Sequence, residues 1–106
     1  MIARLWRGRA DPENTREYTR HIAETVFPSL RDMPGHRGAQ LLRRAVGDQV
    51  EFLAMTFWDS LDDIRQFAGA DIDVAKIEPR AVELLSDYDR FAQHFEIAHV
   101  AGEPGR

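Results

Sequence analysis

The chain contains no cysteine among its 106 residues, which excludes disulfide bonds and thiol catalysis. It also lacks an apolar run long enough to cross a lipid bilayer. The first ten residues, MIARLWRGRA, do not contain the apolar core of a signal peptide. These absences predict a cytoplasmic location and no membrane partner.

Positive charge is not in excess. Lys and Arg number 14 against 18 Asp and Glu, which gives a formal net charge of −4, and the basic residues are scattered. A surface for nucleic acid or anionic lipid is therefore not expected. Hydrophobic residues make up 43% and charged residues 30%, which is typical of globular domains. The length suits one domain with a modest core.

Residues 38–58, GAQLLRRAVGDQVEFLAMTFW, are predicted to form two strands joined by a tight turn at Gly47 and Asp48. In the register that this turn sets, Arg44 faces Glu51 as an attractive cross-strand pair. Side chains alternate between two faces of a strand. One face, apolar enough to pack on helices, carries Leu42, Leu53, Met55 and Phe57. The other, which we interpret as the wall of a cavity or an interface, carries Leu41, Arg43, Phe52, Ala54, Thr56 and Trp58.

The rest of the chain adds two strands and two main helices. Asp11 and Pro12 are typical of a helix start, and Ser60 with Asp63 resembles a capping box. Gly69 is expected to end the second helix. The predicted ranges are 2–9 for the first strand, 11–26 for the first helix, 27–33 for a short extra turn, 60–69 for the second helix, 81–85 for another short helix and 88–98 for the last strand.

This order, β-α-β-β-α-β, predicts a single α+β domain over residues 1–98 with a ferredoxin-like fold. Residues 99–106 are expected to be a disordered tail. Both helices would cover one face of a four-stranded antiparallel sheet. The bare face is predicted to carry Ile2, Trp6, Leu41, Phe52, Ala54 and Trp58. So much exposed apolar surface predicts a homodimer whose two sheets enclose a space.

The chain resembles the dimeric α/β-barrel proteins of the antibiotic biosynthesis monooxygenase superfamily over nearly its whole length. The resemblance rests on four segments, which are IARLW, PGHRGAQLLRR, EFLAMTFWDSLDDIRQFAG and HFEI. The family includes cofactor-free oxygenases of polycyclic phenols, haem-degrading enzymes, and small-molecule isomerases or decarboxylases. These segments are diagnostic of the fold much more than of one activity.

Two branches of that family can be compared with the sequence. The haem-degrading branch has a Trp one helix beyond the strand-end Trp and a proximal His further on, and these positions fall at Phe67 and Ile77. No His lies between His36 and His94. Haem binding in that manner is therefore not expected. The quinone-forming oxygenases are associated with Asn, Trp and Arg, and the only Asn here is Asn14.

The resemblance, taken with the polar groups on the face interpreted as a cavity wall, implies a cofactor-independent monooxygenase or a related enzyme. Its site would lie in a cavity between the sheets of the dimer. His94 would be the base, and Arg4 or Arg43 would stabilise the anion. An aromatic or polyketide-like substrate is predicted to contact Trp6, Trp58, Thr56, Phe52 and Tyr18. No cofactor is expected, and no metal, since no two histidines have metal-ligand spacing.

The alternative is a non-catalytic ligand-binding or structural dimer of the same fold. Arg4, Arg43 and Glu96 would then form an ion-pair network across the dimer, and His94 would be a hydrogen-bonded structural residue. His21, one helical turn from Tyr18, is placed either at the cavity edge or in solvent.

Overall fold

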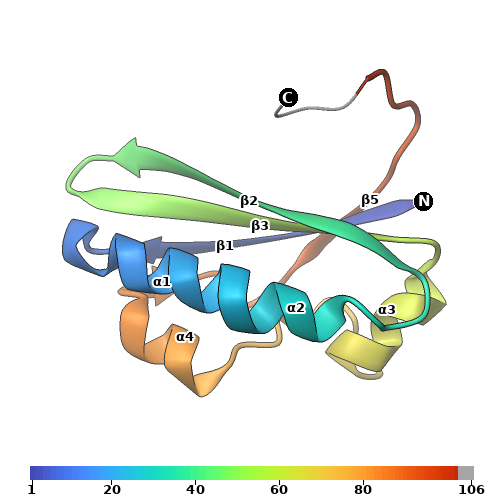
Figure 1. Cartoon of the computed structure of the whole chain (residues 1–106), viewed down its shortest axis with the longest axis horizontal. Coiled ribbons are helices and arrows are strands. Elements are labelled where there is room, and N and C mark those ends of the chain that lie inside the picture. Colours follow the sequence, from blue (N-terminus) through green and yellow to red (C-terminus); the bar gives the residue numbers. More distant parts are fainter. Residues whose placement is uncertain (103–106) are drawn as a thin grey trace.

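The computed structural model describes residues 1–102 (Figure 1). The sheet has the order β2-β3-β1-β4, and β5 also pairs with β1, so β4 and β5 share one edge. This open α+β sheet confirms the predicted fold class. The strands are β1 (Ile2–Ala10), β2 (His36–Val46), β3 (Gln49–Trp58), β4 (Asp87–Tyr88) and β5 (Gln93–Glu96). The helical elements are η1 (Pro12–Asn14), α1 (Thr15–His21), η2 (Ile22–Val26), α2 (Phe27–Leu30), α3 (Leu61–Ala68) and α4 (Pro79–Leu84).

The β2–β3 hairpin has the predicted register. Arg44 pairs with Glu51 across the strands, and its Nε lies 2.9 Å from a carboxylate oxygen of Glu51. Gly47 has a φ of 60°, a left-handed conformation that glycine adopts without steric cost, and this explains why the turn is placed there.

The first helical stretch is longer than predicted and contains a π-helical turn, η2. Pro28 was expected to stop the helix near Val26, but helical structure continues to Leu30. The backbone N–H of Phe27 bonds to the carbonyl of Ile22, five residues back. This wider turn directly precedes Pro28, which sits in the first turn of α2, where a missing N–H is tolerated.

The caps of α3 lie where the sequence predicts them. The Ser60 hydroxyl accepts a hydrogen bond from the backbone N–H of Asp63 at 3.2 Å, and Gly69, with a φ of 89°, follows the last turn. The last predicted strand, in contrast, is split. Residues 90–92 leave the sheet edge and bond instead to the loop after α3, from Ala75 N–H to Arg90 and from Ala92 N–H to Asp73. The predicted tail at 99–106 lies partly outside the described residues.

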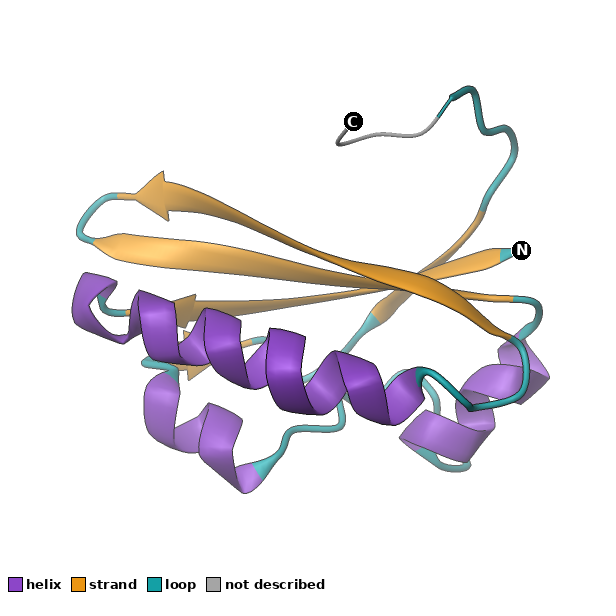
Figure 2. Cartoon of the chain, viewed as in Figure 1, coloured by secondary structure: helices purple, strands orange, loops and turns teal. Residues whose placement is uncertain are grey.

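The prediction of which sheet face is bare was wrong. All helices lie on one side of the sheet (Figure 2), and they cover the side that carries Arg4, Phe52 and Trp58, each less than 5% exposed. The opposite, helix-free face carries Leu5, Leu42, Leu53, Met55, Phe57 and Phe95. Leu42 and Phe95 are 43% and 53% exposed. The residues predicted to line a cavity between two sheets therefore lie under the helices of one chain.

Two apolar clusters fill the space under the helices. One is built around Tyr18, Ile22 and Phe52, and the other around Leu30, Trp58 and Ile64. In residues 1–102, no helix combines the length and the apolar character that a membrane crossing requires.

Candidate functional site

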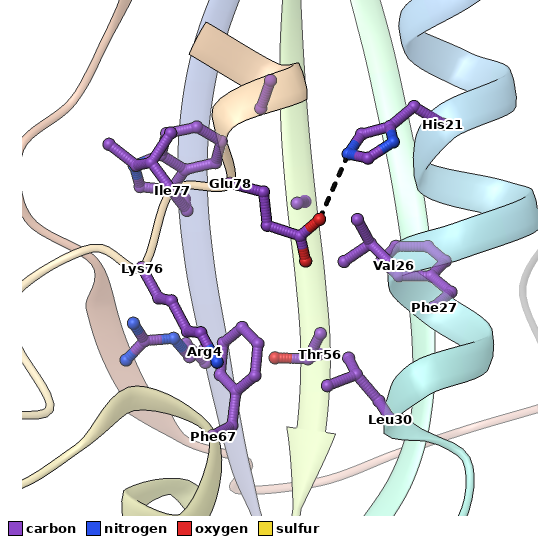
Figure 3. Close-up of a pocket in the computed structure, with 13 residues that line it drawn as sticks. Arg4, His21, Val26, Phe27, Leu30, Thr56, Phe67, Lys76, Ile77 and Glu78 are labelled. Carbon is purple, nitrogen blue, oxygen red and sulfur yellow. Dashed lines mark ion pairs between the residues drawn. The ribbon is translucent and has the colours of Figure 1, made fainter.

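A cavity lies between the sheet and the helices within one copy of the chain (Figure 3). The space inside it that the centre of a water molecule can reach is about 70 Å³. The larger apolar walls are Trp6, Val26, Phe27, Leu30, Phe67 and Ile77. The polar or charged groups on its walls are Arg4, His21, Thr56, Lys76 and Glu78. A mostly apolar cavity with a few converging polar groups is typical of a small-molecule site.

Each wall comes from a different element. Strands β1 and β3 supply the floor with Arg4 and Thr56, because alternate residues of paired strands face the same side. The stretch α1–η2–α2 supplies one side, α3 supplies Phe67, and the segment before α4 supplies Lys76 and Glu78. The site thus depends on segments that only the completed fold brings together.

Arg4 is 4% exposed, and its guanidinium is directed mainly at the loop after α3. It donates to the carbonyl oxygens of Ile72 and, at 3.4 Å, Val74, and it lies 2.8 Å from Nε2 of His94. Its Cζ is also 5.7 Å from the centre of the Phe67 ring. Burial lowers the pKa of Arg4, and the nearby Asp73 carboxylate opposes that shift. Arg4 therefore combines a structural role with positive potential at the cavity.

His94 lies behind Arg4 and is not one of the described cavity walls. Its Nδ1 is 3.3 Å from a carboxylate oxygen of Asp73. Burial, and then the positive charge of Arg4, lowers the pKa of His94, while Asp73 opposes this. If His94 is neutral and its Nε2 accepts a hydrogen bond from Arg4, its proton must be on Nδ1. The Nδ1–H group then donates a hydrogen bond to Asp73. Both ring nitrogens are thus engaged.

His21 and Glu78 form the polar end of the cavity. Their closest atoms, His21 Nε2 and Glu78 Oε2, are 3.5 Å apart, as the dashed line in Figure 3 marks. The side chain of His21 is 10% exposed and that of Glu78 is 38% exposed. The sequence placed His21 only at an edge or in solvent and gave no reason to single out Glu78. Their proximity is a long-range contact for which the sequence carries no local signal.

Thr56 is 7% exposed and lies on the cavity floor. Its oxygen accepts a hydrogen bond from Trp58 Nε1 at 2.9 Å. Because that donor occupies one lone pair, the hydroxyl proton of Thr56 remains free to donate to a ligand oxygen. Trp58 itself is fully buried and stacks on Phe67 with ring centres 6.2 Å apart, so it supports the cavity wall from behind.

The remaining predicted contacts have different positions. Trp6 lines the cavity and donates through Nε1 to the carbonyl of Asp89 at 2.6 Å. Tyr18 and Phe52 pack on each other, with ring centres 4.7 Å apart, in the adjacent core, and burial raises the pKa of the Tyr18 phenol. Arg43 is exposed and does not line this cavity.

The side chains present do not fit haem held by a proximal histidine at the position that the haem-degrading branch uses. Phe67 and Ile77, the positions where that arrangement requires Trp and His, both line the cavity, and an aliphatic side chain cannot coordinate iron. Within residues 1–102, no three His, Asp or Glu side chains are grouped to hold a metal ion.

Residues 1–72 match the family model described as antibiotic biosynthesis monooxygenase. No match was found among curated protein sequences. Solved structures similar to this chain include the haem-degrader MhuD of Mycobacterium tuberculosis with two haems bound in its active site. It is 20% identical, with a TM-score of 0.64, over 96% of this chain and 100% of that chain.

Two further structures have the same fold. One is a monooxygenase from Streptomyces coelicolor, ActVA-Orf6, in complex with nanaomycin D, which is 18% identical over 96% of this chain and 91% of that chain, with a TM-score of 0.62. The other is a putative antibiotic biosynthesis monooxygenase from Deinococcus radiodurans. It is 13% identical over 99% of this chain and 100% of that chain, with a TM-score of 0.64.

Proposed function

The chain belongs to the antibiotic biosynthesis monooxygenase family, and from this premise we propose that it is a cofactor-independent monooxygenase of a flat aromatic or polyketide-like metabolite. The observation that carries the proposal is the cavity under the helices, which has aromatic walls and few polar groups. Structural neighbours bind ligands of that shape, haem in one case and nanaomycin D in another.

The polar groups suit a ligand oxygen that becomes negatively charged. Thr56 offers a hydroxyl proton, and the ammonium of Lys76 lies 5.1 Å from the centre of the Phe67 ring at the cavity wall. Hydrogen-bond donors and positive charge stabilise an enolate. Thr56 is buried, so its hydrogen bond would be strong, whereas Lys76 is exposed and contributes a charge that water screens. Of the residues predicted to stabilise the anion, Arg4 lies at the cavity and adds positive potential, whereas Arg43 lies outside it.

The proposed reaction is the oxidation of an electron-rich phenol or anthrone by dioxygen. Loss of a proton leaves the bonding electron pair on the substrate as an enolate, which transfers electrons to dioxygen. For an anthrone, one oxygen atom replaces the two hydrogens of the methylene carbon. The other oxygen leaves with those hydrogens as water, so dioxygen is the only oxidant that the balance requires.

The test is oxygen uptake by purified protein with anthrone, with one dioxygen expected per anthraquinone formed. Ala54→Phe would fill the cavity from β3 and should abolish turnover, whereas Ala45→Phe, on the exposed part of β2, should not. Melting curves of both variants check that they fold. Uptake no faster than in buffer, or equal activity of the two variants, would count against the proposal.

A ligand-binding protein without turnover is the second candidate. The observation that favours it is the engagement of His94 by Arg4 and Asp73, since a histidine held on both sides serves the structure. Tight binding of anthrone, with no product formed in air, would support this candidate over the first.

We also propose that the chain forms a homodimer through its helix-free sheet face. That face is apolar, and Leu42 and Phe95 on it are 43% and 53% exposed, which is unusual for a surface that stays in water. Leu42→Glu should shift the sedimentation coefficient from dimer to monomer, while Arg20→Glu on the helical side should not. A wild-type protein that sediments as a monomer at micromolar concentration would contradict the proposal.

A further inference from the structure

Glu78 lies directly before α4 and at the wall of the cavity. It is the N-cap residue of α4, and its side chain makes no capping hydrogen bond. The preferred caps are shorter side chains such as Asp, so the longer Glu side chain is free to extend elsewhere. Figure 3 shows the Glu78 side chain extending into the middle of the cavity, with one oxygen directed at His21. Its other oxygen is therefore available to a ligand.

His21 has an unsatisfied polar atom at the same place. Its Nε2 is buried and has no hydrogen-bond partner among the described residues, and Glu78 Oε2 is 3.5 Å away. A buried nitrogen without a partner is costly unless a small movement or a ligand completes its bonding. A slight approach of the Glu78 carboxylate would do so.

We propose that Glu78 is the catalytic base of this cavity and that His21 is the residue that positions it. The inference rests on the proposed function and identifies the group that removes the proton. Among the described cavity walls, Glu78 supplies the one carboxylate. His94, the base predicted from the sequence, is held by Arg4 and Asp73 and is not among the described cavity walls. The geometry therefore favours Glu78.

The step is a proton transfer from the substrate to the free oxygen of Glu78. The C–H or O–H bond breaks, its electron pair stays on the substrate as an enolate, and Glu78 becomes a neutral acid. His21, as an N–H donor to the other oxygen, holds the carboxylate in its orientation. Thr56 and Lys76 line the same cavity and stabilise the enolate oxygen. After oxidation, Glu78 returns the proton to the reduced oxygen that leaves as water.

Proton removal can be measured without oxidation. In deuterated buffer under nitrogen, the wild-type protein should exchange the methylene hydrogens of anthrone faster than buffer alone, as followed by NMR. Glu78→Gln should reduce this exchange and the aerobic kcat by about 100-fold or more, the contribution typical of a positioned base. KM should change little, and Glu78→Asp should recover part of the rate. Glu83→Gln, on the same helix and outside the cavity, is the matched control and should behave as wild type.

The role of His21 requires a pair of variants. His21→Phe keeps an aromatic ring but removes the N–H donor, whereas His21→Gln can still donate. We expect His21→Phe to lower kcat about tenfold with unchanged anthrone binding, and His21→Gln to lower it less. Equal activity of the two variants would overturn the positioning role.

The outcomes separate the two proposals. Wild-type exchange that Glu78→Gln loses, with no oxidation by either protein, would support the base and refute the monooxygenase. Oxidation of anthrone by a folded Glu78→Gln variant at the wild-type rate would refute the proposal that Glu78 is the base. The proposal that the protein is a monooxygenase would still stand. A wild-type protein that neither exchanges nor oxidises anthrone would refute both.

Discussion

Replacing Arg4 by Met should destabilise the protein mainly by releasing the loop after α3. The guanidinium joins β1 to Ile72 and Val74 in that loop and to His94 on β5. Met has a similar length and can keep the apolar contacts of the Arg4 stem, but it offers no donor to any of the three acceptors.

The structure sets the size of the effect. Hydrogen bonds to a charged group contribute about 1.5–3 kcal/mol each. The contact to Val74 is long at 3.4 Å, and Val74 is 44% exposed, so water can replace it. The contacts to Ile72 and His94 therefore dominate, and together they give a loss of about 3–6 kcal/mol. Removing a buried charge recovers part of this loss, which leaves an expected net cost of about 2–3 kcal/mol.

Urea denaturation of Arg4→Met against Arg7→Met measures this cost. Arg7 lies on the same strand but is exposed, so its replacement should change the unfolding free energy by less than about 0.5 kcal/mol. Hydrogen exchange should also accelerate at the amides of Ala75 and Ala92, which hold the loop to residues 90–92. Equal stability of the two variants, or unchanged exchange at these amides, would refute the role assigned to Arg4.

Two other perturbations follow from the same structure. Burial lowers the pKa of both His94 and His36, so below the unfolded value of 6.5 the unfolded chain binds more protons than the folded chain. The unfolding free energy should therefore fall as the pH drops through 6.5 toward the lower folded values, and His94→Gln should weaken this fall in urea titrations at pH 7.5 and 5.5. A wild-type protein with equal stability at both values would contradict the prediction. Gly35→Ala should lower the unfolding free energy by about 1–3 kcal/mol in thermal melts, because Gly35 has a φ of 80° and a Cβ would collide with the Asp63 side chain. Gly47 has a φ of 60° and open space around it, so Gly47→Ala should lower the unfolding free energy less. A larger loss for Gly47→Ala than for Gly35→Ala would contradict this reasoning.

Local signals in the sequence were sufficient for the β2–β3 hairpin and for both ends of α3. The hairpin register follows from Gly47 and from the pairing of Arg44 with Glu51, and the α3 caps follow from Ser60 and Gly69. Each of these depends on residues close in sequence or paired across one turn. This is why the fold class could be predicted.

The buried face of the sheet could not be predicted in this way. The face with Leu42 and Phe57 is more apolar by composition, yet it is the helix-free one. The helix-covered face contains Arg4 and Thr56, whose polar groups are satisfied by the loop after α3 and by Trp58. The partners of Arg4 are far from it in sequence, and the bond between Thr56 and Trp58 depends on how the two side chains are oriented. An alternation pattern records only polarity, so it assigned these residues to a dimer cavity.

The candidate site was predictable only in part. Arg4, Trp6 and Thr56 were singled out from the strand pattern and do line the cavity. Their catalytic or binding roles stay predictions. His21 is the last residue of α1 and Glu78 directly precedes α4. No periodicity links them, so only the packing of α4 against α1 shows that they meet.

The π-helical turn η2 has a consequence for how this chain tolerates insertions and deletions. In a regular helix each residue advances by about 100°, so Leu30, nine positions after His21, would lie on the opposite side. Both nevertheless line the same cavity. A π turn is equivalent to one inserted residue, which rotates the later part of the helix back by roughly one residue's advance. Deleting Ala23 would therefore restore regular winding with His21 and Leu30 eight positions apart, which keeps both on the same side of the helix. The stretch should thus tolerate the loss of one residue at η2, whereas one further inserted residue would turn Leu30 to the opposite side.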